Sequence, residues 1–301
     1  MSAHCCPCRR ASACVAVFTA LVLVAAGSQV RGFATAPGNR ATEKQQPSGR
    51  TSYLGFDLNI YPGDAALGVL RRNFSFAGFW LSAPPGAKEN TWREKRKIVQ
   101  AQGFGFLVLY NGPLSKELKS QTQAIARAAS DAARASTAAR GEGFPQRTII
   151  FLDIEEGGRL PATYHAYLER WVDALARAGY RAGVYCSGIR VDEGQGVTIV
   201  TADDIRNHIG GRDLSYFVFN DVCPPAPGCV VTKNPPAPSA GGVQYASVWQ
   251  FAQSPRRKER TVRCAPSYNA DGNCYAPGDA AHAWFLDLDT ATTADPSGGA
   301  K

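Results

Sequence analysis

Two acidic side chains follow an apolar segment between Thr148 and Gly158. Asp153 and Glu155 are two residues apart, and alternate side chains of an extended chain share a face, so both are expected to point the same way. Like charges held close together raise the pKa of one carboxyl and leave a proton donor beside an anion. The pair is therefore predicted to perform acid/base chemistry. The alternative is a pair of solvated acids at a strand end, which is the expectation for Glu156.

Eight short apolar segments that could position this pair are predicted as strands. They begin near Tyr53, Phe76, Phe104, Thr148, Arg181, Leu214, Tyr245 and Ala283. Helical patterns lie between the first six, at 63–72, 90–102, 115–140, 161–178 and 201–209, whereas 221–244 and 254–280 show no helical period. This order predicts an α/β fold, a TIM-like barrel of the (β/α)5(β)3 type with eight mainly parallel strands and five helices.

The C-terminal ends of parallel barrel strands meet at one mouth, where catalytic groups of such barrels lie. Asp57 on the first strand and Asp287 on the last are therefore expected to converge with the fourth-strand pair, with Asp289 two residues further on. Several aromatic side chains near the same rim are candidates for stacking on sugar rings, although each is also a candidate for the core. They are Tyr61, Trp80, Tyr110, Tyr185, Trp249 and Phe251.

The N-terminal segment predicts export. Arg9 and Arg10 precede an uncharged run from residue 11 to 27, so residues 1–27 are expected to be a signal peptide and 28–52 a disordered tether. The barrel is expected over 53–291 and a disordered tail over 292–301. The predicted location is secreted or extracytoplasmic, in the periplasm or cell envelope, and an uncleaved N-terminal anchor is the alternative.

The cysteines agree with an oxidising compartment. Four of the nine, Cys5, Cys6, Cys8 and Cys14, lie in the export segment. Two local disulfides are expected outside it, because Cys223 and Cys229 bracket one loop and Cys264 and Cys274 bracket another. Cys186 lies inside an apolar strand and is predicted to be a buried side chain.

The distribution of charge favours an anionic glycan over nucleic acid as a binding partner. The formal net charge of +8 falls to +6 when Arg9 and Arg10 are removed with the signal, and five of the remaining cations lie between Arg256 and Arg263. This loop could attract an anionic glycan, whereas nucleic acid is not expected in an exported chain that lacks a binding motif for it. His165, His208 and His282 show no ligand spacing, so neither a metal nor a cofactor is predicted.

Five segments together resemble a known family. They are Gly-Phe-Asp-Leu-Asn at 55–59, Phe-Leu-Asp-Ile-Glu at 151–155, Gly-Val-Tyr at 183–185, Val-Trp-Gln-Phe at 248–251 and Phe-Leu-Asp-Leu-Asp at 285–289. The set resembles the lysozyme-type family 25 glycoside hydrolases. It is more similar still to the glycoside-hydrolase-like domain of exported bacterial proteins with mycobacterial representatives, long catalogued as a domain of unknown function.

The resemblance implies a role for each matching residue. Glu155 matches the proton donor, Asp153 the acid beside it, and Asp57 and Asp287 the supporting carboxylates. The implied reaction is hydrolysis of a β-linked amino-sugar polymer such as peptidoglycan, with no cofactor. Residues expected to contact the glycan are Tyr61, Trp80, Tyr110, Tyr185, Trp249, Gln250 and Asp289.

Two functions remain open from the sequence. The first is a secreted, monomeric glycosidase that acts on a cell-wall or related polysaccharide. The second is a barrel that binds a glycan or an envelope partner without turnover and keeps its acids as hydrogen-bonding groups. The basic insertion at Arg256 to Arg263 and the cysteine-bearing loops depart from the lysozymes, and such loops set the substrate.

Overall fold

The computed structural model describes residues 52–301. The predicted signal peptide, its cysteines and nearly all of the tether lie outside this range. Among the described residues, no helix combines the length and the apolar character that a membrane crossing requires.

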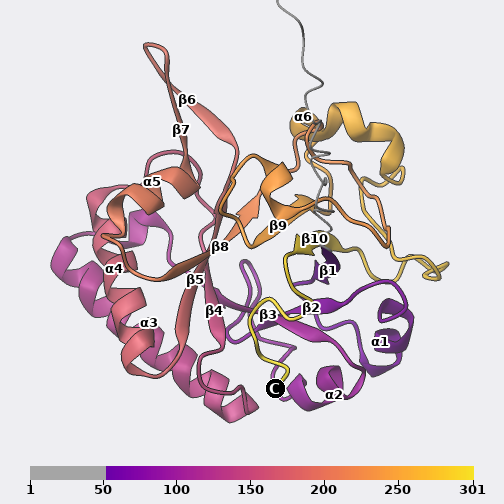
Figure 1. Cartoon of the computed structure of the whole chain (residues 1–301), viewed down its shortest axis with the longest axis horizontal. Coiled ribbons are helices and arrows are strands. Elements are labelled where there is room, and N and C mark those ends of the chain that lie inside the picture. The colour runs from indigo at the N-terminus through magenta and orange to yellow at the C-terminus, as the bar shows by residue number, and fades with distance from the viewer. Residues whose placement is uncertain (1–51) are drawn as a thin grey trace, which may run out of the picture. The chain divides into compact units, whose positions relative to one another are not determined.

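Eight strands close into a barrel in the order β1-β10-β9-β8-β5-β4-β3-β2 (Figure 1). Their bounds are β1 Tyr53–Asp57, β2 Phe76–Trp80, β3 Gly105–Asn111, β4 Ile149–Asp153, β5 Arg181–Ser187, β8 Leu214–Phe219, β9 Val248–Ala252 and β10 Asp287–Ala291. Only β10 among them runs antiparallel to its neighbours, pairing in that sense with both β1 and β9. The predicted TIM-like barrel of eight mainly parallel strands is confirmed.

The five predicted helices are present on the outside of the barrel. They are α1 Asp64–Leu70, α2 Arg96–Ala101, α3 Gln121–Glu142, α4 Ala162–Arg177 and α5 Thr201–His208. The apolar face of α4, from Tyr164 to Leu175, is buried as its three- and four-residue spacing requires. Gly143, with φ of 83°, ends α3, and its N–H donates to Ala139 and Arg140 carbonyls.

Two features were not predicted. A hairpin of β6 (Arg190–Gly194) and β7 (Val197–Val200) projects from the barrel between β5 and α5 (Figure 1). A single helical turn, α6 (Lys258–Thr261), lies in the basic insertion. Both are mostly exposed and short, so neither has the apolar periodicity that identifies an element in the sequence.

The disulfide pairing differs from the expected local one. The bonds join Cys223 to Cys264 and Cys229 to Cys274, with Cα atoms 5.7 and 5.4 Å apart. They therefore join the loop after β8 to the insertion after β9, whereas each loop was predicted to hold its own disulfide. Closing a loop of about 40 residues restricts the unfolded chain more than closing one of about 10. Cys186 is buried and free, as predicted.

Residues 292–301, predicted to be a disordered tail, instead pack against the base of the barrel. Strands β3 and β4 pair only from Val108 and Ile150 onward, and Ser297 fills the space below. Its Oγ accepts from the Val108 N–H at 2.8 Å, and its carbonyl accepts from the Ile149 N–H at 2.8 Å. The segment satisfies barrel N–H groups that would otherwise be buried without partners, which is why it is not a free tail.

We expect Ser297→Ala to lower the free energy of unfolding by about 1–3 kcal/mol, because the Val108 N–H loses its acceptor while it stays buried. Chemical denaturation of both proteins measures the difference. Ser130→Ala is the matched control, since Ser130 is exposed and accepts only from Arg134. Equal stability of the two variants would contradict a structural role for this segment.

Candidate functional site

Three strand ends place carboxyl groups at one mouth of the barrel. Asp57 is the last residue of β1, Asp153 is the last residue of β4, and Asp287 is the first residue of β10. Asp287 reaches the mouth because β10 runs in the opposite direction and lies directly across from Asp57. Asp287 was expected at the C-terminal end of a parallel strand that starts near Ala283, whereas it is the first residue of an antiparallel strand and meets Asp57 from the opposite direction.

These acids line a cavity of about 200 Å³. Glu155 lies in the same cavity wall, just beyond the end of β4, and its side chain is exposed. A larger groove of about 600 Å³ adjoins the cavity and shares Asp57, Asn59 and Asp287 with it. The acids therefore stand at the inner end of a space that is open to solvent.

Gln250 of β9 connects the acids on one side of the cavity. Its Nε2 donates to Asp57 Oδ2 at 2.8 Å and to Asp287 Oδ2 at 3.4 Å, and its Oε1 accepts from the Tyr185 hydroxyl at 2.7 Å. Asp287 also accepts from the Ser254 N–H at 2.6 Å. These bonds fix the orientation of both carboxyl groups without a charged partner.

Burial changes the proton affinity of the acids. It raises the pKa of Asp57 to about 6, against the hydrogen bond from Gln250 and with the repulsion of Glu155 added. Burial also raises the pKa of Asp287 well above its usual range, and repulsion from Asp57 adds to the effect. Asp289, fully buried beneath Asp57, has its pKa raised in the same way. The mouth therefore keeps protons at a pH where solvated carboxyl groups are ionised.

Asp153 and Glu155 differ in their exposure to solvent, since Asp153 is buried and Glu155 is exposed. Asp153 is 4% exposed, and its Oδ1 has no hydrogen-bond partner among the described residues. Burial raises the pKa of Asp153 well above its usual range, and the neighbouring charge of Glu155 raises it further. A buried carboxyl that holds a proton thus lies beside an exposed one that faces the cavity.

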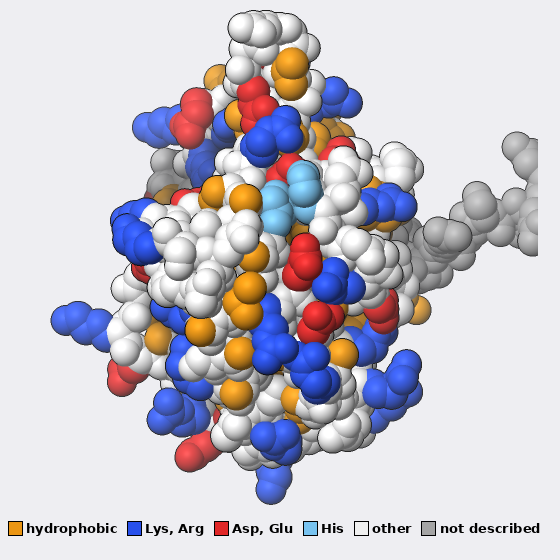
Figure 2. Space-filling model, turned by 90° about the vertical axis from the view of Figure 1, so that its left-hand side faces the viewer, with side chains coloured by type: hydrophobic (Ala, Val, Ile, Leu, Met, Phe, Trp, Pro, Cys, Tyr) orange, Lys and Arg blue, Asp and Glu red, His pale blue; other side chains and the backbone are white. Residues whose placement is uncertain are grey.

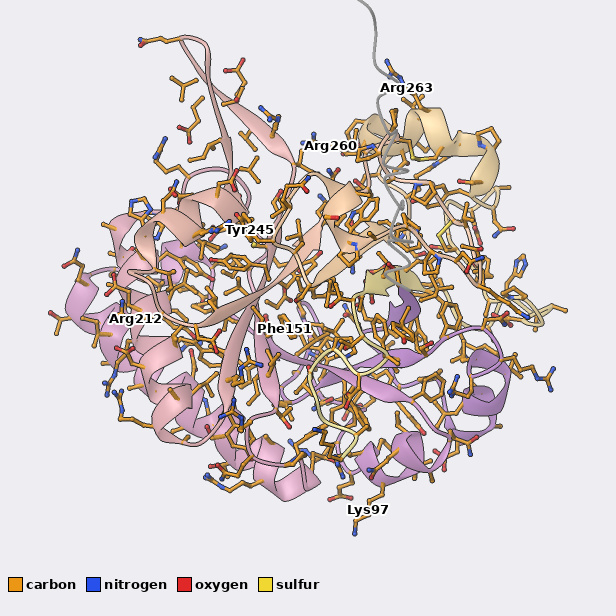
Figure 3. The ribbon with its side chains drawn as sticks, viewed as in Figure 1. Lys97, Phe151, Arg212, Tyr245, Arg260 and Arg263 are labelled. Carbon is orange, nitrogen blue, oxygen red and sulfur yellow. A yellow bond between two sulfur atoms is a disulfide. The ribbon has the colours of Figure 1, made fainter. Side chains whose placement is uncertain are left out.

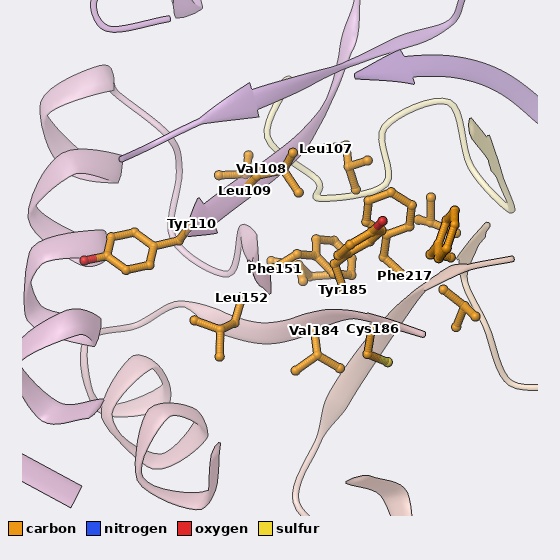
Figure 4. Packing of buried hydrophobic residues seen from close by; sticks show 14 of the residues in the cluster. Leu107, Val108, Leu109, Tyr110, Phe151, Leu152, Val184, Tyr185, Cys186 and Phe217 are labelled. Atoms are coloured by element: carbon orange, nitrogen blue, oxygen red, sulfur yellow. The ribbon is translucent and has the colours of Figure 1, made fainter. Parts of the chain in front are cut away.

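The predicted aromatic residues divide between the site and the core. Trp80 and Tyr185 line the cavity, and Tyr61 lines the adjoining groove. Figure 4 shows Tyr185 beside Phe151 and Phe217 inside the barrel, whereas Tyr110 points outward to a helix. The Tyr110 hydroxyl lies 3.3 Å from Arg134 on α3.

Trp249 and Phe251 also face away from the mouth. Both are fully buried and pack edge to face on each other, and Trp249 Nε1 donates to the Asn220 carbonyl at 2.9 Å. Because strand side chains alternate, Gln250 between them must point into the barrel. Tyr110, Trp249 and Phe251 therefore cannot contact a ligand in the cavity. Asp289 is fully buried and absent from the cavity walls, so it cannot contact a ligand there either.

The structure adds wall residues that the sequence did not indicate. Trp284 and Phe285 line the groove, and the Phe285 side chain is 49% exposed. Their segment was assigned to the last strand, yet it precedes that strand as a loop. An aromatic pair directly before Asp287 is the signal that could have identified them. The cavity wall also includes Asn59, Pro85, Leu109, Phe217, Gln253 and Ser254.

The basic insertion lies beside the mouth. Arg257 lies over the Phe219 ring at 4.9 Å, and its charge opposes the raised pKa of Asp287. Figure 3 shows Arg260 of α6 and Arg263, two residues beyond the end of α6, at the edge of the molecule and away from Phe151 at the centre of the barrel. The predicted attraction for an anionic glycan at this loop remains a prediction.

The family resemblance is confirmed by comparison with known domains. The family model described as an Rv2525c-like, glycoside hydrolase-like domain matches residues 72–214, just under half of the chain. No curated protein matches the chain.

Several solved structures are similar to this chain. An uncharacterized protein from B. stearothermophilus is 20% identical over 79% of this chain and 95% of its own, with a TM-score of 0.53, which supports the fold. The Tat-secreted protein Rv2525c from Mycobacterium tuberculosis, in complex with L-tartrate, is 13% identical over 79% and 94%, with a TM-score of 0.46. The spore cortex lytic enzyme SleM from Clostridium perfringens is 17% identical over 83% and 70%, with a TM-score of 0.48.

We expect the free energy of unfolding to fall as the pH rises through the pKa values of the acids at the mouth. The Asp57 carboxyl, with its pKa raised from 3.8 to about 6, binds a proton in the folded chain that the unfolded chain releases between these values. The free energy of unfolding therefore declines from about pH 4 to above pH 6, by about 3 kcal/mol for this group.

Asp57→Asn should remove this part of the decline, because an asparagine carbonyl still accepts from Gln250 and does not ionise. Urea unfolding at pH 4.5 and pH 7.5 measures the change. Glu89→Gln, at an exposed site, is the control and should keep the wild-type slope. If Asp57→Asn kept it as well, the Asp57 carboxyl would not be the group that titrates.

Proposed function

We propose that this chain, which carries an Rv2525c-like, glycoside hydrolase-like domain, hydrolyses the glycosidic bonds of a β-linked amino-sugar polysaccharide of the peptidoglycan type. One observation carries the proposal. The cavity places an exposed carboxyl, Glu155, beside a buried carboxyl whose pKa is raised, Asp153, in a space open to solvent. Such a pair of carboxyl groups can transfer a proton to the oxygen of a leaving group.

In the proposed reaction, Glu155 delivers the proton that the Asp153–Glu155 pair shares. The bond between C1 of the sugar and the glycosidic oxygen breaks as that oxygen takes the proton. A carboxylate of the mouth or the substrate's own acetamido group supports the positive charge at C1. Water then adds to C1 and returns a proton to Glu155, so the pair is restored.

The remaining acids support the reacting sugar in this proposal. Asp57 and Asp287, oriented by Gln250, present hydroxyl-binding groups at the inner end of the groove. Tyr61, Trp284 and Phe285 form an apolar wall along the groove, where a further sugar ring can stack. No step requires a cofactor or a metal.

The disulfides also fit an extracytoplasmic enzyme. Cys223–Cys264 and Cys229–Cys274 brace the loops beside the mouth, and such bonds persist in oxidising compartments. We therefore place the protein in the periplasm, the cell envelope or the medium, where the proposed polymer is found. A monomer suffices, since the described chain supplies every group named above.

Glu155→Gln should lower kcat/KM for soluble peptidoglycan fragments by about 10²–10⁴-fold, because the amide cannot deliver a proton. The wild-type pH profile should be bell-shaped, and the variant should lose the fall in rate on the alkaline side, which reports ionisation of the general acid. Glu156→Gln is the matched control. Its side chain accepts from the Ser115 N–H at 2.6 Å, which a glutamine oxygen also does, so its activity should stay near wild type.

The same experiment distinguishes the non-catalytic alternative. Wild-type protein that binds these fragments, cleaves none of them across the pH range and binds equally well as Glu155→Gln would be a glycan-binding barrel and not an enzyme. Binding is followed by titration calorimetry and cleavage by release of reducing ends.

Phe285→Ala should raise KM roughly tenfold and leave kcat nearly unchanged, because stacking on a ring remote from the cleaved bond contributes about 1.4 kcal/mol to binding alone. The side chain is 49% exposed, so its removal should leave the fold intact. Val262→Ala, at a residue 68% exposed outside the groove, is the control. An unchanged KM in Phe285→Ala would remove the groove from the substrate path.

A further inference from the structure

Two histidines that are far apart in the sequence meet on the outer face of the barrel. His165 of α4 and His208 at the end of α5 stack with ring centroids 4.0 Å apart, and both lie beside Asp204 of α5. Figure 2 shows histidine side chains together on the face covered by α3, α4 and α5. The three residues are absent from the walls of the cavity and groove at the mouth, and they contradict the expectation of scattered histidines.

The geometry of this cluster suits a small cation. One ligand atom from each of the three side chains can be chosen so that all lie within 4.8 Å of one another. His165 Nε2 lies 3.1 Å from Asp204 Oδ2, and His208 Nδ1 lies 3.5 Å from Asp204 Oδ1. Ligands that bind zinc at about 2.0–2.2 Å in a tetrahedron stand about 3.3 Å from one another, so only small side-chain movements are needed.

The cluster also leaves buried polar atoms without partners. Asp204 is 2% exposed, and its Oδ1 has no hydrogen-bond partner within residues 52–301. His165 Nε2 is likewise buried and has no well-aligned partner there. A buried carboxylate oxygen and an imidazole nitrogen left in this state are costly, and one cation between them would satisfy both.

The other Asp204 oxygen is held in place by the backbone. Asp204 Oδ2 accepts from the Leu160 N–H at 2.9 Å, which orients the carboxyl toward the histidines. His208 Nδ1 lies 2.7 Å from the Asp204 carbonyl, so a bound cation would take the place of that contact. Arg159 Nη1 lies 3.7 Å from Asp204 Oδ1 and competes with a cation, although its Nη2 also lies 3.0 Å from Glu193.

Solvent can reach the cluster. A surface groove of about 590 Å³ borders it and is lined by His165, His208, Arg159 and Arg212, together with the acids Glu169 and Asp173. Arg212 is engaged by Asp173, with Nε 2.9 Å from Oδ1. Water in this groove can complete the coordination of a cation held by three protein ligands.

We propose that His165, Asp204 and His208 form a binding site for a divalent first-row transition metal, with Zn²⁺ as the expected ion. A set of two imidazoles and one carboxylate binds such ions in preference to Mg²⁺ or Ca²⁺, which prefer oxygen ligands alone. The site would fasten the loop that carries Glu155, because α5 already holds that loop through Leu160 and through the bond from Thr201 Oγ1 to the Gly158 carbonyl at 2.9 Å.

The test measures metal binding and needs no glycan. Chelator-treated full-length protein is titrated with ZnCl₂ by calorimetry, and with CoCl₂ while the visible spectrum is recorded. We expect one site, a visible cobalt band that indicates nitrogen and oxygen ligands, and a rise in Tm of several degrees with excess Zn²⁺. Mg²⁺ at the same concentration should produce no change.

Two variants assign the site. His208→Ala, at a side chain 48% exposed, and Asp204→Asn, which keeps an acceptor for Leu160, should each weaken Zn²⁺ binding at least tenfold. His282→Ala is the matched control, because that ring stacks on Tyr275 and lies outside the cluster, and its affinity should equal wild type.

Two results would overturn the proposal. One is wild-type protein that binds neither Zn²⁺ nor Co²⁺ at 100-fold molar excess, which would leave the cluster as two histidines stacked beside an aspartate with no metal role. The other is His208→Ala binding as tightly as His282→Ala. Because neither result depends on cleavage of a polysaccharide, the proposed hydrolase can fail while this site stands, and the reverse also holds.

Discussion

Burial of carboxyl groups without a cationic partner is the constraint on which the mouth of this barrel depends. Asp57, Asp153 and Asp289 are each at most 6% exposed, and none takes part in a salt bridge within residues 52–301. A buried acid in this position keeps its proton because ionisation is costly for a side chain that is almost entirely shielded from water. The amide of Gln250 is neutral and so orients Asp57 and Asp287 without removing that cost. The mouth therefore loses stability as the pH rises toward neutral, and it holds protons that a reaction can use.

The packing beneath the mouth keeps this arrangement in place. Phe151 and Phe217 meet edge to face with centroids 6.2 Å apart, and Tyr185 lies 4.7 Å from Phe217 (Figure 4). Gly78 on the neighbouring strand leaves room for Asp57, since any side chain there would collide with the Asp57 Cβ. A shift of one strand by one residue would turn its acid out of the barrel and a bulky apolar residue in. Close packing of the interior therefore fixes the register, and the register fixes where the acids stand.

The sequence was sufficient for the features that depend on local pattern. The apolar spacing along α4 and the pair Asp153 and Glu155 follow from the period of a helix and of a strand, so both could be placed from the residues alone. Tyr110 and Trp249 were predicted to face the cavity but point out of the barrel, because the orientation of a strand residue depends on where its strand begins. The reversed direction of β10 also lay beyond local pattern, because a strand reads the same in either direction.

Features that join distant segments could not be predicted for a related reason. The bond from Cys223 to Cys264 crosses between two loops, so its partners are set by how those loops lie on the barrel and not by their spacing. The same holds for His165 and Asp204, which are 39 positions apart in the sequence and 3.1 Å apart in space. The strand ends therefore set the acid chemistry, while the loops between them set the groove wall formed by Trp284 and Phe285. Since the disulfides hold the loops beside the mouth, changes in those loops should alter what the groove accepts without altering the acids beneath it.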